Sequence, residues 1–127
     1  MSKNDNRPLS PHIGIYDFPM TAMLSVLHRG TGAALTAGLI LLVTALAAAA
    51  SGESSWNTMQ GLLSSWFGYL VLFAFTATLY YHFCNGIRHL MWDMGKGLEK
   101  TDQKPWGKIV IAATGALTCL TWVVVLL

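Results

Sequence analysis

Three long stretches of this sequence contain no Asp, Glu, Lys or Arg. They run from Gly30 to Gly52, from Ser54 to Ile87 and from Ile109 to Leu127, and are 23, 34 and 19 residues long. A helix needs about 20 consecutive apolar residues to cross the hydrocarbon core of a bilayer. Each stretch is therefore long enough to hold one membrane-spanning helix.

The composition excludes several other classes of protein. Charged residues make up 11% of the 127 residues and hydrophobic residues 54%, whereas about 25% of a typical soluble domain is charged. Intrinsic disorder needs the opposite balance, and eight Lys and Arg are too few for a nucleic-acid footprint. The two cysteines, Cys84 and Cys119, lie within the apolar stretches and have no disulfide or zinc-site spacing.

We therefore predict an all-α integral membrane protein with three transmembrane helices. The third stretch is rich in β-branched residues, which favour strands in water. Lipid offers no partner for an open strand edge, so a spanning segment must still form a helix. The predicted helices are 18–50, 62–93 and 107–127, and they are joined by an N-terminal segment 1–17, an outer loop 51–61 and a cytoplasmic loop 94–106.

The basic residues predict how the chain is oriented. Lys and Arg precede or open the first span and recur between the second and third, whereas the connection 51–60 has none. By the positive-inside rule, the N-terminus and the 94–106 loop face the cytoplasm. The residues on which this prediction rests are Lys3, Arg7, Arg29, Lys96, Lys100, Lys104 and Lys108.

Ionisable residues are concentrated in the second span. Placing such side chains in a bilayer costs free energy, so each of them is a candidate functional residue. His82, Gly86, His89 and Asp93 follow one helical stripe, and Arg88 lies beside it. With Asp93 at the boundary, His82 lies about 16 Å deeper, near the bilayer midplane. Three interpretations remain open: an imidazole hydrogen-bonded between helices, a proton relay, or a ligand of a metal or haem. Gly86 would let a flat macrocycle approach the helix.

A second polar group opens the first span. Ser25, His28, Arg29 and Gly32 fall on one broad helical face. Arg29 is either a positive-inside anchor or, with Ser25, a hydrogen-bond donor to a quinone oxygen, whose negative charge grows on reduction. This group is expected in the same leaflet as Arg88 and His89.

Several segments resemble the cytochrome b subunit of succinate dehydrogenase, the larger "C" membrane anchor of respiratory complex II. The similarity covers all three spans. It is carried by R-P-L-S-P-H-I-G-I-Y (7–16), S-V-L-H-R-G-T-G (25–32) and H-F-C-N-G-I-R-H-L-M-W-D-M-G-K-G-L (82–98).

The resemblance implies more than the spacing does. It implies a three-helix anchor that pairs with a second small anchor subunit, holds one haem b between them and docks an iron–sulfur subunit and a flavoprotein subunit. His82 matches the axial haem ligand, with the other histidine supplied by the partner anchor. Ser25 and Arg29 match residues of the ubiquinone site, and His28, Arg88 and His89 match positions around the haem propionates.

We therefore expect a subunit that passes electrons from succinate, by way of iron–sulfur clusters, to ubiquinone. The chain itself is expected to hold no catalytic residue for succinate and to bind membrane lipid but no nucleic acid. The alternatives are a haem-free structural anchor, a quinol:fumarate reductase anchor, or a small transporter using His82 and His89. A start at Met1 without a presequence favours the bacterial inner membrane over the mitochondrial one.

Overall fold

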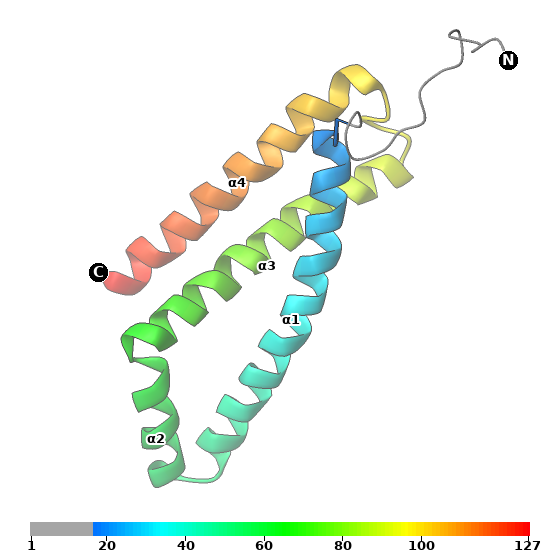
Figure 1. Cartoon of the computed structure of the whole chain (residues 1–127). Helices are drawn as coiled ribbons and strands as arrows, with labels where there is room; N and C mark the ends of the chain where they lie inside the picture. Colours follow the sequence, from blue (N-terminus) through cyan, green and yellow to red (C-terminus); the bar gives the residue numbers. More distant parts are fainter. Residues whose placement is uncertain (1–16) are drawn as a thin grey trace, which may run out of the picture.

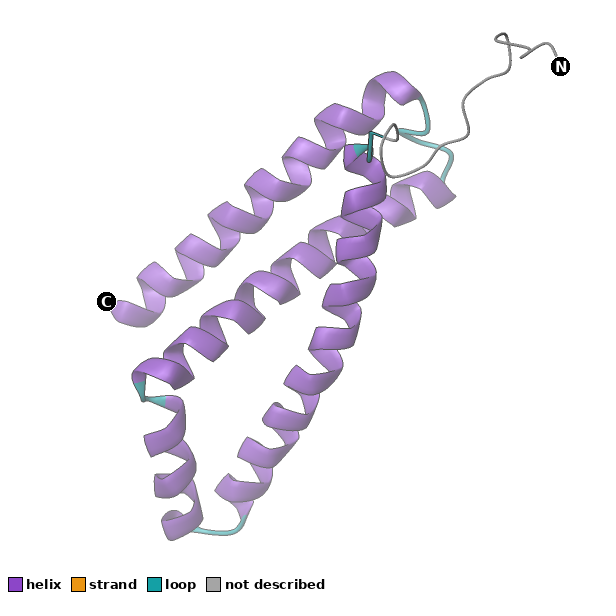
Figure 2. Ribbon diagram, in the orientation of Figure 1, coloured by secondary structure: helices purple, strands orange, loops and turns teal. Residues whose placement is uncertain are grey.

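The computed structural model describes residues 17–127 and consists there of four helices without strands. They are α1 (Met20–Ala50), α2 (Glu53–Leu63), α3 (Trp66–Asp93) and α4 (Lys100–Leu126) (Figure 2). Three of them, α1, α3 and α4, are long and apolar enough to cross a membrane. The predicted all-α membrane architecture is confirmed, including a helix over the β-branched third stretch.

Helix α3 lies between α1 and α4 and contacts both. Figure 1 shows that the start of α1, the end of α3 and the start of α4 gather at one end of the molecule, which we call the loop end because residues 94–99 connect α3 to α4 there. From the loop end α1 and α3 diverge, and α2 joins their far ends. The predicted segment 1–17 lies outside the described residues except for Asp17.

The structure differs from the sequence prediction at the 51–61 connection, which is a helix rather than a loop. Gly52 makes the turn out of α1 with φ 110°, a backbone conformation that glycine adopts without strain. Glu53 then lies in the first turn of α2, where its carboxylate complements the positive end of the helix dipole. The second long helix consequently begins at Trp66, after Ser65 caps it by accepting a hydrogen bond from the Gly68 amide at 3.0 Å.

Helix α4 begins seven residues before the predicted start at 107. Its first turn forms ahead of Pro105, because the Glu99 carbonyl accepts hydrogen bonds from the amides of Asp102 (3.0 Å) and Gln103 (3.3 Å). Pro105 removes one helical hydrogen bond but does not end the helix. The predicted loop 94–106 is therefore reduced to residues 94–99, in which Gly95 and Gly97 have positive φ.

The surface is apolar and the interior is small. Leu24 and Val110 are the buried hydrophobic side chains within residues 17–127, and most large aliphatic and aromatic side chains of the long helices are exposed. A water-soluble protein of this size does not expose such a surface. Threonine hydroxyls on the long helices bond to carbonyls of the preceding turn, so they need no water: Thr31, Thr36, Thr44, Thr76, Thr114, Thr118 and Thr121.

We predict that Gly68→Ala destabilises the corner between α2 and α3. A Cβ at Gly68 would overlap the backbone carbonyls of Leu62 and Leu63, which cannot move without opening the corner. Overpacking of this kind costs about 1–3 kcal/mol. The apparent melting temperature of the purified assembly in detergent should fall.

Gly61→Ala is the matched control, since it is a helical glycine in the same connection whose Cβ would meet nothing within 4 Å. It should leave the melting temperature unchanged or raise it, because alanine favours a helix interior by about 1 kcal/mol over glycine. Equal melting temperatures for the two variants would contradict the corner geometry.

Candidate functional site

Three histidines that are far apart in the sequence form one stack near the loop end. His28 of α1 lies between two rings of α3: its ring centroid is 4.0 Å from that of His82, with the planes 11° apart, and 5.0 Å from that of His89, with the planes 28° apart. All three side chains are half-buried. The sequence placed them on two separate helices, and the crossing of α1 with α3 brings them together.

The hydrogen bonds of His82 determine which of its ring nitrogens carries the proton. Nδ1 lies 3.2 Å from the backbone carbonyl of His28 and 3.2 Å from the hydroxyl of Thr31. A carbonyl can only accept, so the favourable arrangement has the proton on Nδ1. Nε2 then carries the lone pair, and no hydrogen bond to it is found within the part of the chain that the structure describes.

Two glycines control how closely the helices approach around this stack. A Cβ on Gly32 would lie 3.2 Å from Cε1 of His82, so the absence of a side chain lets the ring lie against α1. A Cβ on Gly86 would lie 3.8 Å from Cε1 of His28. The space beside Gly86, which the sequence suggested for a macrocycle, is therefore next to the His28 ring in this structure.

A buried cation lies beside the stack. Arg88 is 3% exposed and Asn85 is fully buried, and the guanidinium donates to the Asn85 side-chain oxygen at 3.4 Å. The guanidinium also lies over the Trp92 ring at 4.2 Å, and His89 meets the same ring edge-on. Asn85 was not singled out from the sequence. Its signal was its position three residues before Arg88, on the same helical face.

Several polar atoms in this region have no hydrogen-bond partner among the described residues. They are Nδ1 of His28, Nε2 of His89, Nδ2 of Asn85 and both Nε and Nη2 of Arg88. Buried polar groups are nearly always paired, and a buried charge without a partner is especially costly. The concentration of unpaired nitrogens in one place marks a region that suits an anionic or hydrogen-bond-accepting group.

Ser25 and Arg29 lie on α1 close to this region but are not joined to it. Ser25 is half-buried and Arg29 is exposed, and neither forms a hydrogen bond or ion pair with another described residue. Tyr81 of α3 also reaches this part of α1, since its hydroxyl donates to the Leu24 carbonyl at 2.8 Å. Asp93 is exposed at the end of α3.

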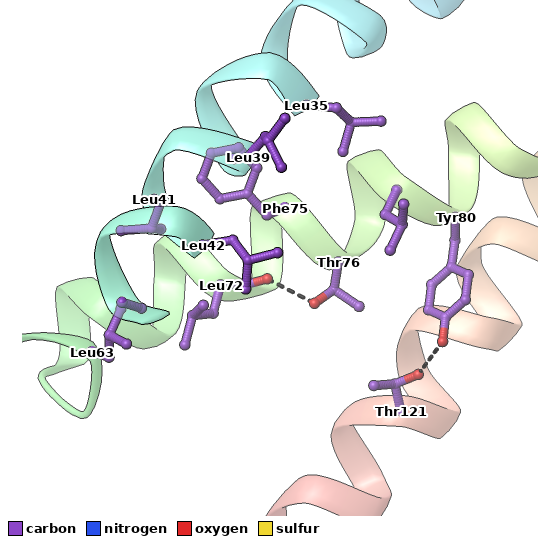
Figure 3. Close-up of a pocket in the computed structure, with 13 residues that line it drawn as sticks. Leu35, Leu39, Leu41, Leu42, Leu63, Leu72, Phe75, Thr76, Tyr80 and Thr121 are labelled. Atoms are coloured by element: carbon purple, nitrogen blue, oxygen red, sulfur yellow. Dashed lines mark hydrogen bonds between the residues drawn. The ribbon is translucent and has the colours of Figure 1, made fainter. Parts of the chain in front are cut away.

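An apolar cavity lies elsewhere, between the diverging parts of α1 and α3. It has a volume of about 610 Å³ and an almost entirely apolar lining that includes Leu42, Leu72 and Phe75 (Figure 3). Its hydroxyls are already paired: Thr76 bonds to the Leu72 carbonyl, and Tyr80 to Thr121 at 2.7 Å. This cavity offers shape and hydrophobicity but no free polar group for chemistry.

Over residues 17–127, no three His, Cys, Asp or Glu side chains are placed to hold one ion. The arrangement can instead offer one imidazole nitrogen, that of His82, with hydrogen-bond donors beside it.

Comparison with known proteins identifies the family. A family model described as "Succinate dehydrogenase/Fumarate reductase transmembrane subunit" matches residues 3–121, which is most of the chain. The chain belongs to this family. The resemblance inferred from the sequence motifs is confirmed.

Individual members of the family are similar over most of their length. The chain is 37% identical over 119 residues to the succinate dehydrogenase cytochrome b556 subunit of Paracoccus denitrificans, covering 94% of this chain and 92% of that protein. It is 39% identical to the b556 subunit of Rickettsia prowazekii, covering 94% and 93%. It is 44% identical over 117 residues to the mitochondrial b560 subunit of Bos taurus, covering 89% and 69%. As a member of this family the chain is a membrane subunit of an enzyme complex.

We predict that Trp92→Phe loosens the loop 94–99. The Trp92 indole donates to the Gly97 carbonyl at 3.0 Å and so ties the loop to the end of α3. Phenylalanine keeps a ring beneath Arg88 but loses this bond, whose net contribution is about 1 kcal/mol. Hydrogen–deuterium exchange of the loop amides in the intact assembly should accelerate about fivefold.

Trp92→Leu should accelerate the exchange further, because it also removes the ring contacts with Arg88 and His89. Trp66→Phe, at a side chain that is 79% exposed, is the control and should leave the loop unchanged. If the loop amides of Trp92→Phe exchange at the wild-type rate, the hydrogen bond from the indole does not hold the loop.

Proposed function

We propose that this chain is a haem b-containing membrane anchor subunit of a succinate:quinone oxidoreductase, complex II. Electrons from succinate oxidation would pass through iron–sulfur clusters of a partner subunit to ubiquinone. The observation that supports this most is the state of His82, whose Nδ1 donates to a backbone carbonyl while Nε2 is left with a free lone pair. A metal-bound histidine usually has its other ring nitrogen oriented by a carbonyl in this way.

The residues around His82 fit a haem. A haem carries two propionate carboxylates, and unpaired nitrogens of three residues are available to them. His28 stacks on His82 and on His89, and Arg88 lies over the Trp92 ring that His89 also contacts. Arg88 supplies a permanent positive charge, and the histidines can supply N–H donors. His82 would hold the iron, together with a histidine of the partner anchor. A bound haem would supply one-electron redox chemistry.

Ser25 and Arg29 are proposed to bind the quinone. Their α1 positions are one turn apart on the same side of the helix, so both side chains can reach one ligand carbonyl. The guanidinium of Arg29 would stabilise the negative charge that grows on the quinone oxygen, and the Ser25 hydroxyl would donate a hydrogen bond to it. Arg29 is exposed, so it is free to meet a ligand held against α1 by neighbouring subunits.

The partners and location belong to the same proposal. A second small anchor would complete the haem site, and an iron–sulfur subunit and a flavoprotein subunit would dock on the cytoplasmic side, where the flavoprotein oxidises succinate. Lys96, Lys104 and Lys108 all lie at or near the loop end, which supports placing that end in the cytoplasm. The similar b556 subunits of Paracoccus and Rickettsia support a bacterial inner membrane.

We predict that His82→Ala removes or alters the haem absorbance of the purified assembly, because it deletes the imidazole whose Nδ1 is held by the His28 carbonyl and whose Nε2 is free. The reduced-minus-oxidised spectrum, normalised to flavin content, is the measurement. Leu79→Ala, an exposed residue one turn earlier on α3, is the control. An unchanged bis-histidine spectrum in His82→Ala would remove this assignment, and a wild-type assembly without haem would favour the purely structural anchor.

We predict that Arg29→Ala slows quinone reduction by about 10²-fold, the typical effect of losing one donor to a developing oxyanion. Succinate oxidation with an artificial acceptor should be unchanged, because that reaction bypasses the quinone site. Arg29→Lys keeps the positive charge but lacks the planar guanidinium with its several donors, so quinone reduction should proceed at an intermediate rate. Equal loss of both activities in Arg29→Ala would indicate an assembly defect instead.

A further inference from the structure

We propose that Thr31 is a positioning residue for His82: its hydroxyl fixes the Nδ1–H tautomer and the orientation of the imidazole, and thereby presents Nε2 as the ligand nitrogen. This inference rests on the proposed haem function and deepens it. Thr31 itself would touch neither the iron nor the quinone.

The first step is the direction of the Thr31 hydroxyl. A threonine hydroxyl has one proton, and that of Thr31 is donated to the His28 carbonyl at 2.9 Å, within its own helix. The lone pairs of the oxygen are therefore left to accept. The nitrogen that faces them, at 3.2 Å, is Nδ1 of His82 on the neighbouring helix.

The second step is that Nδ1 faces two acceptors at once. The carbonyl of His28 and the hydroxyl oxygen of Thr31 are both 3.2 Å from it. A proton on Nδ1 satisfies both contacts, whereas a bare Nδ1 would place its lone pair against that of the carbonyl. Among apolar helices, where hydrogen bonds are strong and unpaired polar groups costly, this difference keeps the proton on Nδ1.

The third step is that, among the groups that contact the His82 ring, Thr31 provides the hydrogen bond that a side-chain substitution can remove. The His28 carbonyl belongs to the backbone and is present whatever the side chains are. The His28 ring stacks on His82 with the planes 11° apart, and the edge of the His82 ring lies against Gly32. Both contacts restrict the orientation of the His82 ring by shape alone. Of the side chains contacting His82, Thr31 supplies the directional hydrogen bond.

The expected consequence concerns the iron as well as the ring. A hydrogen bond accepted from Nδ1–H increases the donor strength of Nε2, and a stronger donor favours the oxidised metal. Removing the Thr31 hydroxyl leaves the His28 carbonyl as the single acceptor. The haem midpoint potential should then shift to a more positive value, and the ring should gain rotational freedom.

The test compares three variants in the intact purified assembly. Thr31→Val is nearly the same shape but lacks the hydroxyl, and Thr31→Ser keeps the hydroxyl. Thr36→Val is the matched control, because Thr36 is on the same helix and bonds only to the Gly32 carbonyl within its own helix. Haem content is measured by the pyridine haemochrome assay, ligand geometry by the low-spin electron paramagnetic resonance signal, and the potential by redox titration.

We expect Thr31→Val to shift the resonance signal and raise the potential, or to lose haem, while Thr31→Ser and Thr36→Val remain like the wild type. A wild-type signal and potential in Thr31→Val would overturn the inference, and so would a Thr31→Ser assembly altered as much as Thr31→Val. The proposed haem function is tested separately: if the reduced-minus-oxidised spectrum of His82→Ala is the same as that of the wild type, the haem assignment itself is wrong.

Discussion

Water is absent from the middle of a bilayer, so each polar atom on α1, α3 and α4 needs a partner within the protein or a bound group. Much of the structure follows from this constraint. Seven threonine hydroxyls bond to carbonyls of their own helices. Longer side chains connect helices: Tyr81 reaches the Leu24 carbonyl, and Tyr80 reaches Thr121. These bonds supplement a very small buried hydrophobic interior, because the apolar surface faces outward.

The same constraint makes the exceptions informative. Nitrogens of His28, Asn85, Arg88 and His89 have no partner in the described chain, and they lie in one region where α1 crosses α3. Elsewhere within residues 17–127, the one unpaired buried side-chain atom is the Trp122 indole nitrogen. A group of unpaired nitrogens beside the free Nε2 of His82 is therefore the feature of the described chain that the proposed haem site would explain.

The fold was largely predictable because the absence of charge over about 20 residues admits few structures besides a spanning helix. The details at the helix ends were not. Helix α2 occupies the expected outer loop. Its apolar residues, Trp56, Met59, Leu62 and Leu63, recur at helical spacing, but this pattern is short and begins only after Gly52 has turned the chain out of α1. Helix α4 begins before Pro105 because the Glu99 carbonyl closes a turn there. Such ends are decided by individual hydrogen bonds, which composition does not encode.

The sequence alone determined that His28, His82, Arg88 and His89 must be explained, since ionisable residues are costly in an apolar helix, and its motifs identified the family. It could not determine that His28 stacks between His82 and His89, that Asn85 is buried against Arg88, or that Thr31 meets Nδ1 of His82. Those contacts join residues about 50 positions apart, or depend on which face of α3 turns inward. Only the crossing of α1 with α3 fixes them, because helical periodicity specifies the face of each helix but neither the depth nor the angle at which two faces meet.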